Sequence, residues 1–352
     1  MANRQVIVAM SGGIDSLMAA ILLKKRGRYQ VSAVHLKLFA YNSQESDIEG
    51  LKDTCRGLDI PLEVVDFEEE FRRSVVDYFC REYRFGRTPN PCTTCNKEIK
   101  FGFLLNKVLT SGFDYLATGH YARVEYSPHR YHLLRGRDPS KDQSYFLYRL
   151  GQKELKHLIL PLGNLFKSEV IVKAHRLSIK ANGKEDSQDI CFVRDNDYRA
   201  FLAGCIPLEE GDIIDTAGNT LGKHRGLSLY TVGQRQKLGL SSGKRLYVLK
   251  IDTQSNRIVV GSKKELLNHK LIARDMTWVS GVPPMDEGNI TARIRYGTEE
   301  ASVRLRNKDS GMEVTFDRAQ SAIAPGQDVV FYRGEEVLGG GIIERANREN
   351  EK

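Results

Sequence analysis

Ser11-Gly12-Gly13-Ile14-Asp15-Ser16 lies between an apolar run, Val6 to Met10, and a helical stretch that begins at Leu17. Two adjacent glycines turn without a Cβ penalty, so backbone amides and the N-terminus of the following helix can point at one anion. The serines add hydroxyl donors, and Asp15 can recruit Mg²⁺. A tight turn with an ordinary helix cap is the alternative. The order of strand, glycines, acid, serine and helix favours a phosphate-binding loop.

This loop differs from two common nucleotide-binding loops. It lacks the lysine of G-x-x-x-x-G-K-[ST] and the spacing of G-x-G-x-x-G. It resembles the pyrophosphate-binding loop of the PP-loop ATP pyrophosphatases. The resemblance implies that ATP adenylates a substrate oxygen and that the loop retains the leaving pyrophosphate.

Length, charge and cysteine use limit the class of protein. The chain has 352 residues, enough for two or three domains, and 53 Lys+Arg against 45 Asp+Glu give a formal charge of +8, which suits a polyanion such as RNA. No apolar run approaches the roughly 18 residues of a membrane span, and the phosphate loop leaves no room for a cleaved signal. We therefore expect a cytoplasmic protein without a membrane contact, whose six cysteines are reduced thiols.

The chain changes character twice. Up to about residue 163, strand-like and helix-like runs alternate, which predicts an α/β fold with a doubly wound parallel sheet and ligands at the carboxyl ends of its strands. The segment 152–204 is mostly helical, and short strands separated by glycines follow Pro207, among them Ile290 to Tyr296. We expect a PP-loop catalytic domain with a helical extension over 1–205, a small β-rich domain over 206–270 and a β-barrel over 271–347.

The cysteines form a second informative pattern. Asn90-Pro91-Cys92-Thr93-Thr94-Cys95-Asn96 is expected in a loop just before a helix, where the helix dipole and nearby lysines stabilise thiolates. A third cysteine lies in Ser187-Gln188-Asp189-Ile190-Cys191-Phe192. A C-x-x-C pair permits a metal site, a redox pair or two core thiols. For Cys55, Cys80 and Cys205, beside apolar residues or near a domain boundary, packing is favoured.

A series of motifs resembles, in order and spacing, the tRNA-specific 2-thiouridylases of the MnmA family. The motifs are the loop 11–16 and the segments 86–101, 117–123, 141–145, 187–192, 231–235, 239–240, 295–296 and 324–327. The resemblance implies a PP-loop domain, a small central domain and a β-barrel that contacts tRNA. It also implies conversion of wobble uridine 34 to 2-thiouridine in tRNAs of the Lys, Glu and Gln types.

The same resemblance assigns the chemistry. ATP adenylates the C2 oxygen of uridine, because that oxygen is otherwise a poor leaving group. Cys191 carries a persulfide, supplied by a cysteine desulfurase or a sulfur-relay protein, and Cys95 is the nucleophile that attacks the persulfide or the activated base. The implied ATP-binding residues are Ala9, Met10, Ser11, Gly12, Gly13, Ile14, Asp15, Ser16, Leu36 and Gly119. Leu36 is equally interpretable as a strand core residue.

Contacts with tRNA are also implied by resemblance. They involve Asn90, Pro91 and Cys92 around the target base, and His120, Lys141, Asp142, Gln143, Arg295, Tyr296 and Gln327 elsewhere. An unpaired wobble base can be flipped out and read at its edge while Lys and Arg neutralise phosphates. The alternatives are an exposed strand for 295–296 and a buried, hydrogen-bonded side chain for His120.

Position 92 departs from the better known family pattern, which has Asp where this chain has Cys92. A thiol replaces an acid–base carboxylate poorly. Together, Cys92, Cys95 and Cys191 could instead bind three irons of a [4Fe-4S] cluster and leave the fourth open to sulfide. We prefer the persulfide route to the cluster route.

Two other classes of protein share part of this pattern. A PP-loop amidotransferase or ligase would use the first motif but would have no use for Cys95 and Cys191. A non-catalytic RNA-binding protein with a structural zinc site would explain the charge and the C-x-x-C pair, but neither the phosphate loop nor a third cysteine.

Overall fold

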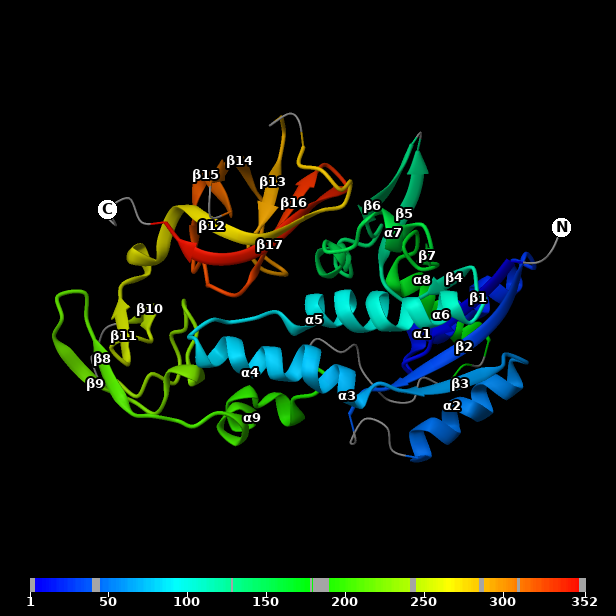
Figure 1. The fold of residues 1–352 in the computed structure, drawn as a ribbon, viewed down its shortest axis with the longest axis horizontal. Helices are drawn as coiled ribbons and strands as arrows, with labels where there is room; N and C mark the ends of the chain where they lie inside the picture. The colour runs from blue at the N-terminus through cyan, green and yellow to red at the C-terminus, as the bar shows by residue number, and fades with distance from the viewer. Residues whose placement is uncertain are drawn as a thin grey trace.

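The computed structural model describes residues 4–39, 45–127, 129–177, 179, 190–240, 245–284, 288–308 and 311–347. The first part of the chain forms a parallel sheet with the strand order β3-β2-β1-β4-β7 (Figure 1). The strands are β1 (Arg4–Ala9), β2 (Tyr29–Lys37), β3 (Leu62–Asp66), β4 (Tyr115–Ala117) and β7 (Leu158–Ile159). All four neighbouring pairs are parallel, so the predicted doubly wound fold is confirmed.

Helices cover this sheet because consecutive residues of its central strand β1, Val6, Ile7 and Val8, are buried and therefore apolar on both faces. Helix α1 (Ile14–Lys25) follows β1 directly and buries seven of its residues, and α8 (Lys167–Arg176) packs beside it through Val170 and Ala174. Helix α2 (Glu45–Gly57) joins β2 to β3. The phosphate loop therefore lies at the carboxyl end of the central strand, where ligands gather in such sheets.

Two helical segments extend from the sheet. One comprises α3 (Glu68–Phe71), the π-helix η1 (Arg72–Val76) and α4 (Asp77–Arg84). The other comprises α5 (Pro91–Thr94), the π-helix η2 (Cys95–Leu104) and α6 (Leu105–Thr110), and runs between the first segment and the barrel (Figure 1). π-Helical turns are rare and are often found at functional sites.

The last strands form a closed six-stranded barrel. Its order is β12-β15-β14-β13-β16-β17, and β12 pairs with β17 to close it. The strands are β12 (Leu267–Trp278), β13 (Thr291–Arg293), β14 (Ala301–Lys308), β15 (Gly311–Ser321), β16 (Asp328–Arg333) and β17 (Glu336–Ala346). The predicted barrel is confirmed, but the strand expected through Tyr296 ends at Arg293. A turn follows, in which Thr298 N–H donates to the Arg295 carbonyl and Gly297 has a positive φ of 76°.

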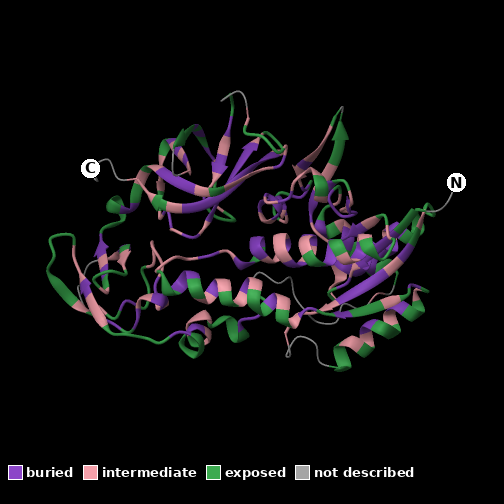
Figure 2. Ribbon diagram, in the orientation of Figure 1, coloured by how far each residue is buried: buried purple, intermediate pink, exposed green. Residues whose placement is uncertain are grey.

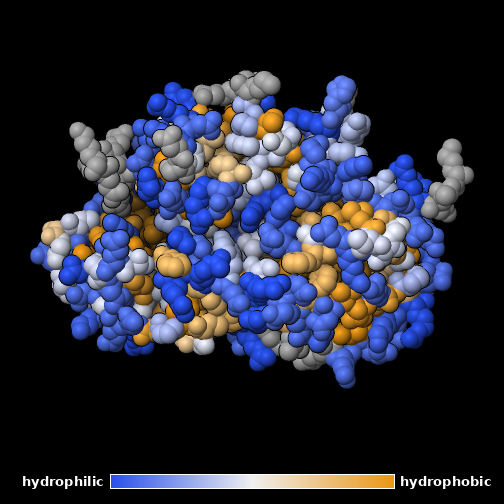
Figure 3. All heavy atoms as spheres, in the orientation of Figure 1, coloured by the Kyte–Doolittle hydropathy of each residue, from blue (hydrophilic) through white to orange (hydrophobic). Residues whose placement is uncertain are grey.

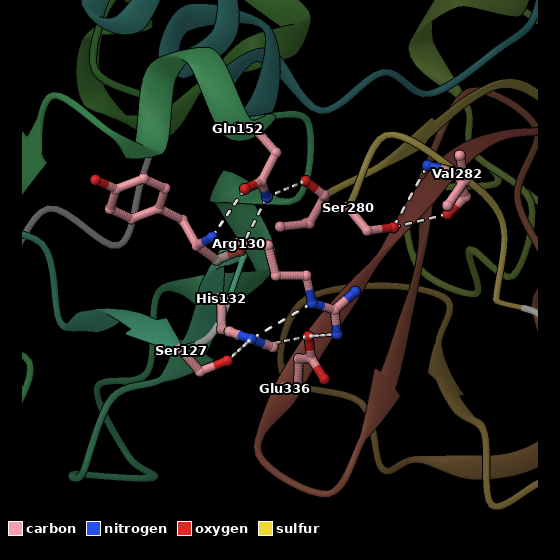
Figure 4. Close-up of polar contacts among 9 residues, drawn as sticks. Ser127, Arg130, His132, Gln152, Ser280, Val282 and Glu336 are labelled. Carbon is pink, nitrogen blue, oxygen red and sulfur yellow. Dashed lines mark hydrogen bonds and ion pairs between the residues drawn. The ribbon is translucent and has the colours of Figure 1, made fainter.

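A hairpin of the catalytic part joins the barrel. β5 (Ala122–Ser127) and β6 (Arg130–Arg135) pair with each other, and β6 continues the barrel sheet beside β17. Glu336 on β17 accepts hydrogen bonds from Arg130, at 3.0 Å, and His132, at 2.7 Å (Figure 4). Gln152 joins the hairpin to the barrel through the Tyr131 backbone and the Val279 carbonyl.

The central part is a small sheet with the order β10-β11-β8-β9, as expected for a β-rich domain. Its strands are β8 (Gly211–Ile214), β9 (Thr220–His224), β10 (Tyr247–Asp252) and β11 (Arg257–Gly261). The remaining short elements are η3 (Ser144–Leu147), α7 (Gln152–Leu155), η4 (Arg194–Asn196), α9 (Tyr198–Cys205), η5 (Leu227–Leu229) and η6 (Lys263–Leu266).

Burial follows the layers of the fold. Buried residues line the parallel sheet, the facing sides of the two helical segments and the barrel interior (Figure 2). Hydrophilic side chains cover most of the face drawn in Figure 3. In the ranges given above, no helix is long and apolar enough to cross a membrane.

Candidate active site

The phosphate loop is held by its own serines. Ser16 Oγ donates to the Gly13 carbonyl at 2.9 Å and accepts from Ser11 N–H at 3.1 Å. Gly12 has a φ of +81°, which only glycine adopts easily. Helix α1 begins at Ile14, three residues earlier than expected, so its unpaired N–H groups face the loop. The geometry is that of an anion site at a helix N-terminus.

Gly119 lies directly against this loop. A Cβ at position 119 would meet the Asp15 carbonyl carbon and the Ser16 nitrogen, both at 2.8 Å. The chain after β4 therefore reaches the backbone of the first turn of α1, which only a glycine permits. The close approach explains why position 119, an ATP contact implied by the resemblance, is occupied by glycine.

Asp15 has partners that the sequence did not reveal. Lys167 Nζ lies 2.8 Å from Asp15 Oδ1 and 2.7 Å from Oδ2, and the Tyr121 hydroxyl donates to Oδ1 at 2.8 Å. Lys167 is the first residue of α8, separated from Asp15 by 152 positions. In the sequence, only the position of Lys167 at the start of a helix could have indicated a role at the phosphate loop. The carboxylate supplies the hard oxygen ligands that Mg²⁺ prefers, so the donor chemistry fits that ion.

The remaining implied ATP contacts lie at the ends of two strands. Ala9 ends β1, and Met10 N–H donates to the Val34 carbonyl on β2 at 2.8 Å. Leu36 is half-buried on β2 and packs against the core, so both interpretations of this residue stay open. These residues share the sheet edge that carries the phosphate loop.

Cys92 and Cys95 belong to a helix and not to the loop that was expected. The Asn90 side chain accepts from Cys92 N–H at 3.1 Å, and Pro91 occupies the first position of α5. An Asn cap followed by Pro is a strong helix start, which explains why the helix begins at Pro91 and already includes both cysteines. Both thiols therefore occupy the first turns, nearest the positive end of the helix.

Cys191 is anchored beside these thiols. Phe192 is buried, with its ring centroid 5.7 Å from that of Phe71 and 5.4 Å from that of Phe79. The preceding residues of the motif, Ser187, Gln188 and Asp189, lie outside the described residues. Cys191 interacts electrostatically with both Cys95 and Cys92, so the three cysteines of the motif series meet in one group.

The thiols of this group are held in the neutral form. Cys92 and Cys191 are open to solvent, yet surrounding protein and the neighbouring thiols raise the pKa of Cys92 to about 11 and the pKa of Cys191 to about 12. Burial also raises the pKa of Cys95. The positive charge of Lys100 acts in the opposite direction and lowers the pKa of all three thiols. In an α-helix, residues five apart differ by about 140°, whereas the i→i+5 bonds of η2 bring Lys100 nearer the face of Cys95.

The three thiols are, by chemistry, an appropriate donor set for an iron–sulfur cluster. Among the described residues, no three His, Cys, Asp or Glu side chains are close enough together to hold a single metal ion. A cluster makes a different demand, because each of its thiolates binds a separate iron. The persulfide and cluster routes therefore both stay open at this site.

His120 lies between the phosphate loop and the helix that carries Cys95. Its Nδ1 lies 2.8 Å from the Thr118 hydroxyl and its ring packs near Phe101. Burial, with Lys100 nearby, holds the pKa of His120 well below its usual value, so the imidazole is neutral at pH 7. The next residue on each side, Gly119 and Tyr121, contacts Asp15. Three consecutive residues thus reach from the phosphate loop to the helix that begins at Cys95.

The barrel holds the segment that precedes the thiol helix. Gln327 Nε2 donates to the Thr88 carbonyl at 2.9 Å, and Thr88 N–H donates to the Pro325 carbonyl at 2.7 Å. Asp328 accepts from the hydroxyls of Thr93, at 3.0 Å, and Tyr148, at 2.8 Å. Burial raises the pKa of Asp328 to about 6. Sequence analysis missed Asp328, because no pattern marks a single acid at a strand start.

The remaining implied tRNA contacts come from two domains. Gln143 accepts from Tyr121 N–H at 3.0 Å, and Lys141 precedes it on the same loop. Tyr296, exposed in its turn beside Arg295, packs on Phe146 with ring centroids 4.5 Å apart. Asp142 is different, because it is buried and accepts hydrogen bonds from Gly136 and Ser144.

A HUP-type nucleotide domain followed by two β domains is the class that this fold and site define. Family models match in that order: the tRNA methyl transferase HUP domain over residues 4–195, the tRNA methyl transferase PRC-barrel domain over 199–262 and the aminomethyltransferase β-barrel domain over 268–343. The chain belongs to the MnmA family of tRNA-specific 2-thiouridylases.

Two curated relatives support this membership over nearly the whole length. The tRNA-specific 2-thiouridylase MnmA of Acetivibrio thermocellus is 41% identical over 98% of this chain and 100% of its own. That of Chlorobium chlorochromatii is 42% identical over 96% of this chain and 98% of its own. Among solved structures, the U34-tRNA thiolase NcsA from Methanococcus maripaludis with its [4Fe-4S] cluster matches at 19% identity and a TM-score of 0.36, covering 58% of this chain and 64% of that one. So distant a likeness says nothing about the chemistry of this site.

Proposed function

We propose that this chain is an ATP-dependent tRNA-uridine 2-sulfurtransferase acting on uridine 34. The observation that carries the proposal is the segment Gly119-His120-Tyr121, which contacts the phosphate loop through Gly119 and Tyr121 and packs through His120 near Phe101, on the helix that begins at Cys95. An enzyme that activates a base with ATP and then transfers sulfur to it needs both sites beside one bound base. We propose residues 1–205 as the catalytic domain, 206–270 as the central domain and 271–347 as the tRNA-contacting barrel.

The first step is activation of the base. The C2 oxygen of uridine attacks the α-phosphorus of ATP, the bond to the β-phosphate breaks, and pyrophosphate stays in the loop 11–16. Asp15 would hold Mg²⁺, which supplies positive charge against the phosphates. The backbone N–H groups at the start of α1 orient the leaving group.

The second step is sulfur transfer. The terminal sulfur of a Cys191 persulfide attacks C2, and AMP leaves with the former C2 oxygen. Cys95 then attacks the Cys191 sulfur, which releases 2-thiouridine and leaves a Cys95–Cys191 disulfide. A thiol reductant restores both cysteines for the next turnover. Lys100 favours the thiolate forms, because its charge lowers the pKa of each thiol.

The tRNA would contact residues of two domains. Lys141 and Arg295 would neutralise phosphates, Tyr296 would offer a stacking surface, and Asn90 to Cys92 would surround the flipped base. Because Asp142 is buried and bonded within the protein, we assign it to holding the Lys141–Gln143 loop. We propose the Lys, Glu and Gln tRNAs as substrates and a cysteine desulfurase or sulfur-relay protein as donor.

The cysteine variants test this route. Purified protein is given tRNA, Mg·ATP and a persulfide donor, and 2-thiouridine is measured by nucleoside mass spectrometry. Cys95→Ala and Cys191→Ala should each abolish the product. Cys92→Asp should retain substantial activity, since two thiols suffice. Cys205→Ala, an exposed cysteine on α9, is the matched control and should behave as wild type.

The iron content of the purified protein distinguishes the persulfide route from the cluster route. Protein prepared without oxygen should thiolate tRNA with well below one cluster per chain. Activity that rises in proportion to reconstituted iron and sulfide, and disappears with a chelator, would overturn the persulfide route and make Cys92, Cys95 and Cys191 cluster ligands. Product formation by Cys191→Ala would remove its role in either route.

A further inference from the structure

Lys167 brings a positive charge to a loop whose own sequence contains none. Its side chain is 11% exposed, and its Nζ lies within 2.8 Å of both oxygens of Asp15. A buried ammonium at this point has a large desolvation cost, which a partner of opposite charge offsets. The ion pair lies at the N-terminus of α1, where the loop geometry is suited to an anion.

The scaffold fixes this lysine in place. The Lys167 backbone N–H donates to Asp138 at 2.9 Å, and Phe166 N–H donates to Glu169 at 2.8 Å, so the start of α8 is capped. Val170 and Ala174 are fully buried against the core that contains α1. A flexible lysine that served only solubility would not be anchored at its backbone in this way.

We propose that Lys167 is a phosphate-binding residue that holds the β,γ-pyrophosphate of ATP, and that Asp15 neutralises it when no nucleotide is bound. On binding, Asp15 turns to the magnesium ion and the Lys167 ammonium binds the phosphates. During adenylation the bond between the α-phosphorus and the bridging oxygen breaks, and that electron pair stays on the pyrophosphate, where Lys167 stabilises it. Lys167 thereby takes the part that a lysine within the loop plays in other phosphate loops.

Tyr121 completes the arrangement. Its hydroxyl donates to Asp15 Oδ1 at 2.8 Å, and Lys167 Nζ lies 5.9 Å from its ring centroid. The tyrosine therefore keeps Asp15 oriented when the lysine moves to phosphate. Its backbone N–H also donates to Gln143, which belongs to the loop proposed to contact tRNA.

The test is binding in the absence of tRNA. Wild type, Lys167→Gln and Lys167→Arg are titrated with ATP, inorganic pyrophosphate and AMP in the presence of Mg²⁺, by calorimetry. A charge-assisted hydrogen bond contributes about 1.5–3 kcal/mol, so Lys167→Gln should bind ATP and pyrophosphate roughly 10- to 150-fold more weakly. AMP, which lacks the two distal phosphates, should bind as to wild type. Lys167→Arg keeps the charge and should lose only a few-fold.

Controls separate this inference from general damage. Arg176→Gln removes an exposed positive charge from the last turn of the same helix and should change none of the three affinities. Unchanged ATP and pyrophosphate binding in Lys167→Gln, or an equal loss for ATP and AMP, would overturn the inference and leave the ion pair structural. If Lys167→Gln does not fold, melting of Lys167→Met and Lys167→Arg with and without pyrophosphate replaces the titration, and pyrophosphate should stabilise only the arginine variant.

The inference rests on the proposed use of ATP, and the two can fail separately. If wild type binds neither ATP nor pyrophosphate, the proposed function fails. If wild type binds both and Lys167→Gln binds them equally well, only the role of Lys167 fails.

Discussion

Replacing Gly119 with alanine should disturb the ATP site through a single methyl group. The new Cβ would lie 2.8 Å from the backbone of Asp15 and Ser16, where ordinary contact begins near 3.4 Å, an overlap of about 0.6 Å (3.4 minus 2.8). Neither atom belongs to a flexible side chain, so the loop or the end of β4 must move. Overpacking of this kind costs about 1–3 kcal/mol.

That cost should appear in ATP binding, because the displaced atoms begin the helix that faces the phosphates. We expect the dissociation constant for Mg·ATP to rise roughly 5- to 150-fold, measured by calorimetry, with tRNA affinity unchanged. Gly57→Ala is the matched control, since a Cβ there meets nothing within 4 Å. If Gly119→Ala bound ATP as wild type does and melted at the same temperature, the close approach of β4 to the loop would be wrong.

Three further outcomes follow from charge and burial. Because the folded-state pKa of Asp328 is raised from 3.8 to about 6, the folded protein binds the extra proton between these values. Stability should therefore fall, relative to Asp328→Asn, by about 2 kcal/mol as pH rises from 4 to 7. A constant gap between the two proteins in denaturant unfolding across this range would contradict the shift. Cys92 and Cys191 have pKa values of about 11 and 12, so at pH 8 they should react with iodoacetamide far more slowly than the same cysteines in the unfolded chain. Lys100→Met removes the charge that lowers both pKa values, so the reaction should be slower still in that variant. Peptide mass spectrometry measures both rates. Replacing Lys141 and Arg295 with glutamine should weaken tRNA binding and lower its salt slope by roughly 0.7–0.9 per lost phosphate contact; an identical slope in the double variant would return both residues to ordinary surface.

Local features of the site were accessible from sequence. The phosphate loop was found because strand, glycines and helix are neighbours in the chain, and the alternation of runs predicted the parallel sheet. The start of α5 was missed although Asn90 and Pro91 mark it, because the cysteines suggested a loop.

Features that depend on distant segments were not accessible. Lys167 reaches Asp15 across 152 positions, and Asp328 reaches Thr93 across 235. Each is an ordinary acid or base in its own segment, and only the packing of helices or domains gives it a partner. The turn at Arg295 and Tyr296 was similarly hidden, because alternation predicts a strand until Gly297 ends it.

The pairing of Leu134 on β6 with Glu336 on β17 has a consequence for synthesis of the protein. The two positions are 202 residues apart (336 minus 134), and at 5–20 residues per second the later strand emerges about 10–40 s after the hairpin. During that interval β6 is an open sheet edge, which is a hazard for pairing with other chains. Gln327 and Asp328 emerge in the same late stretch, so the thiol helix is without its barrel contacts until then. The parallel sheet with its phosphate loop is therefore complete in sequence well before the barrel residues that hold the thiol helix have been made.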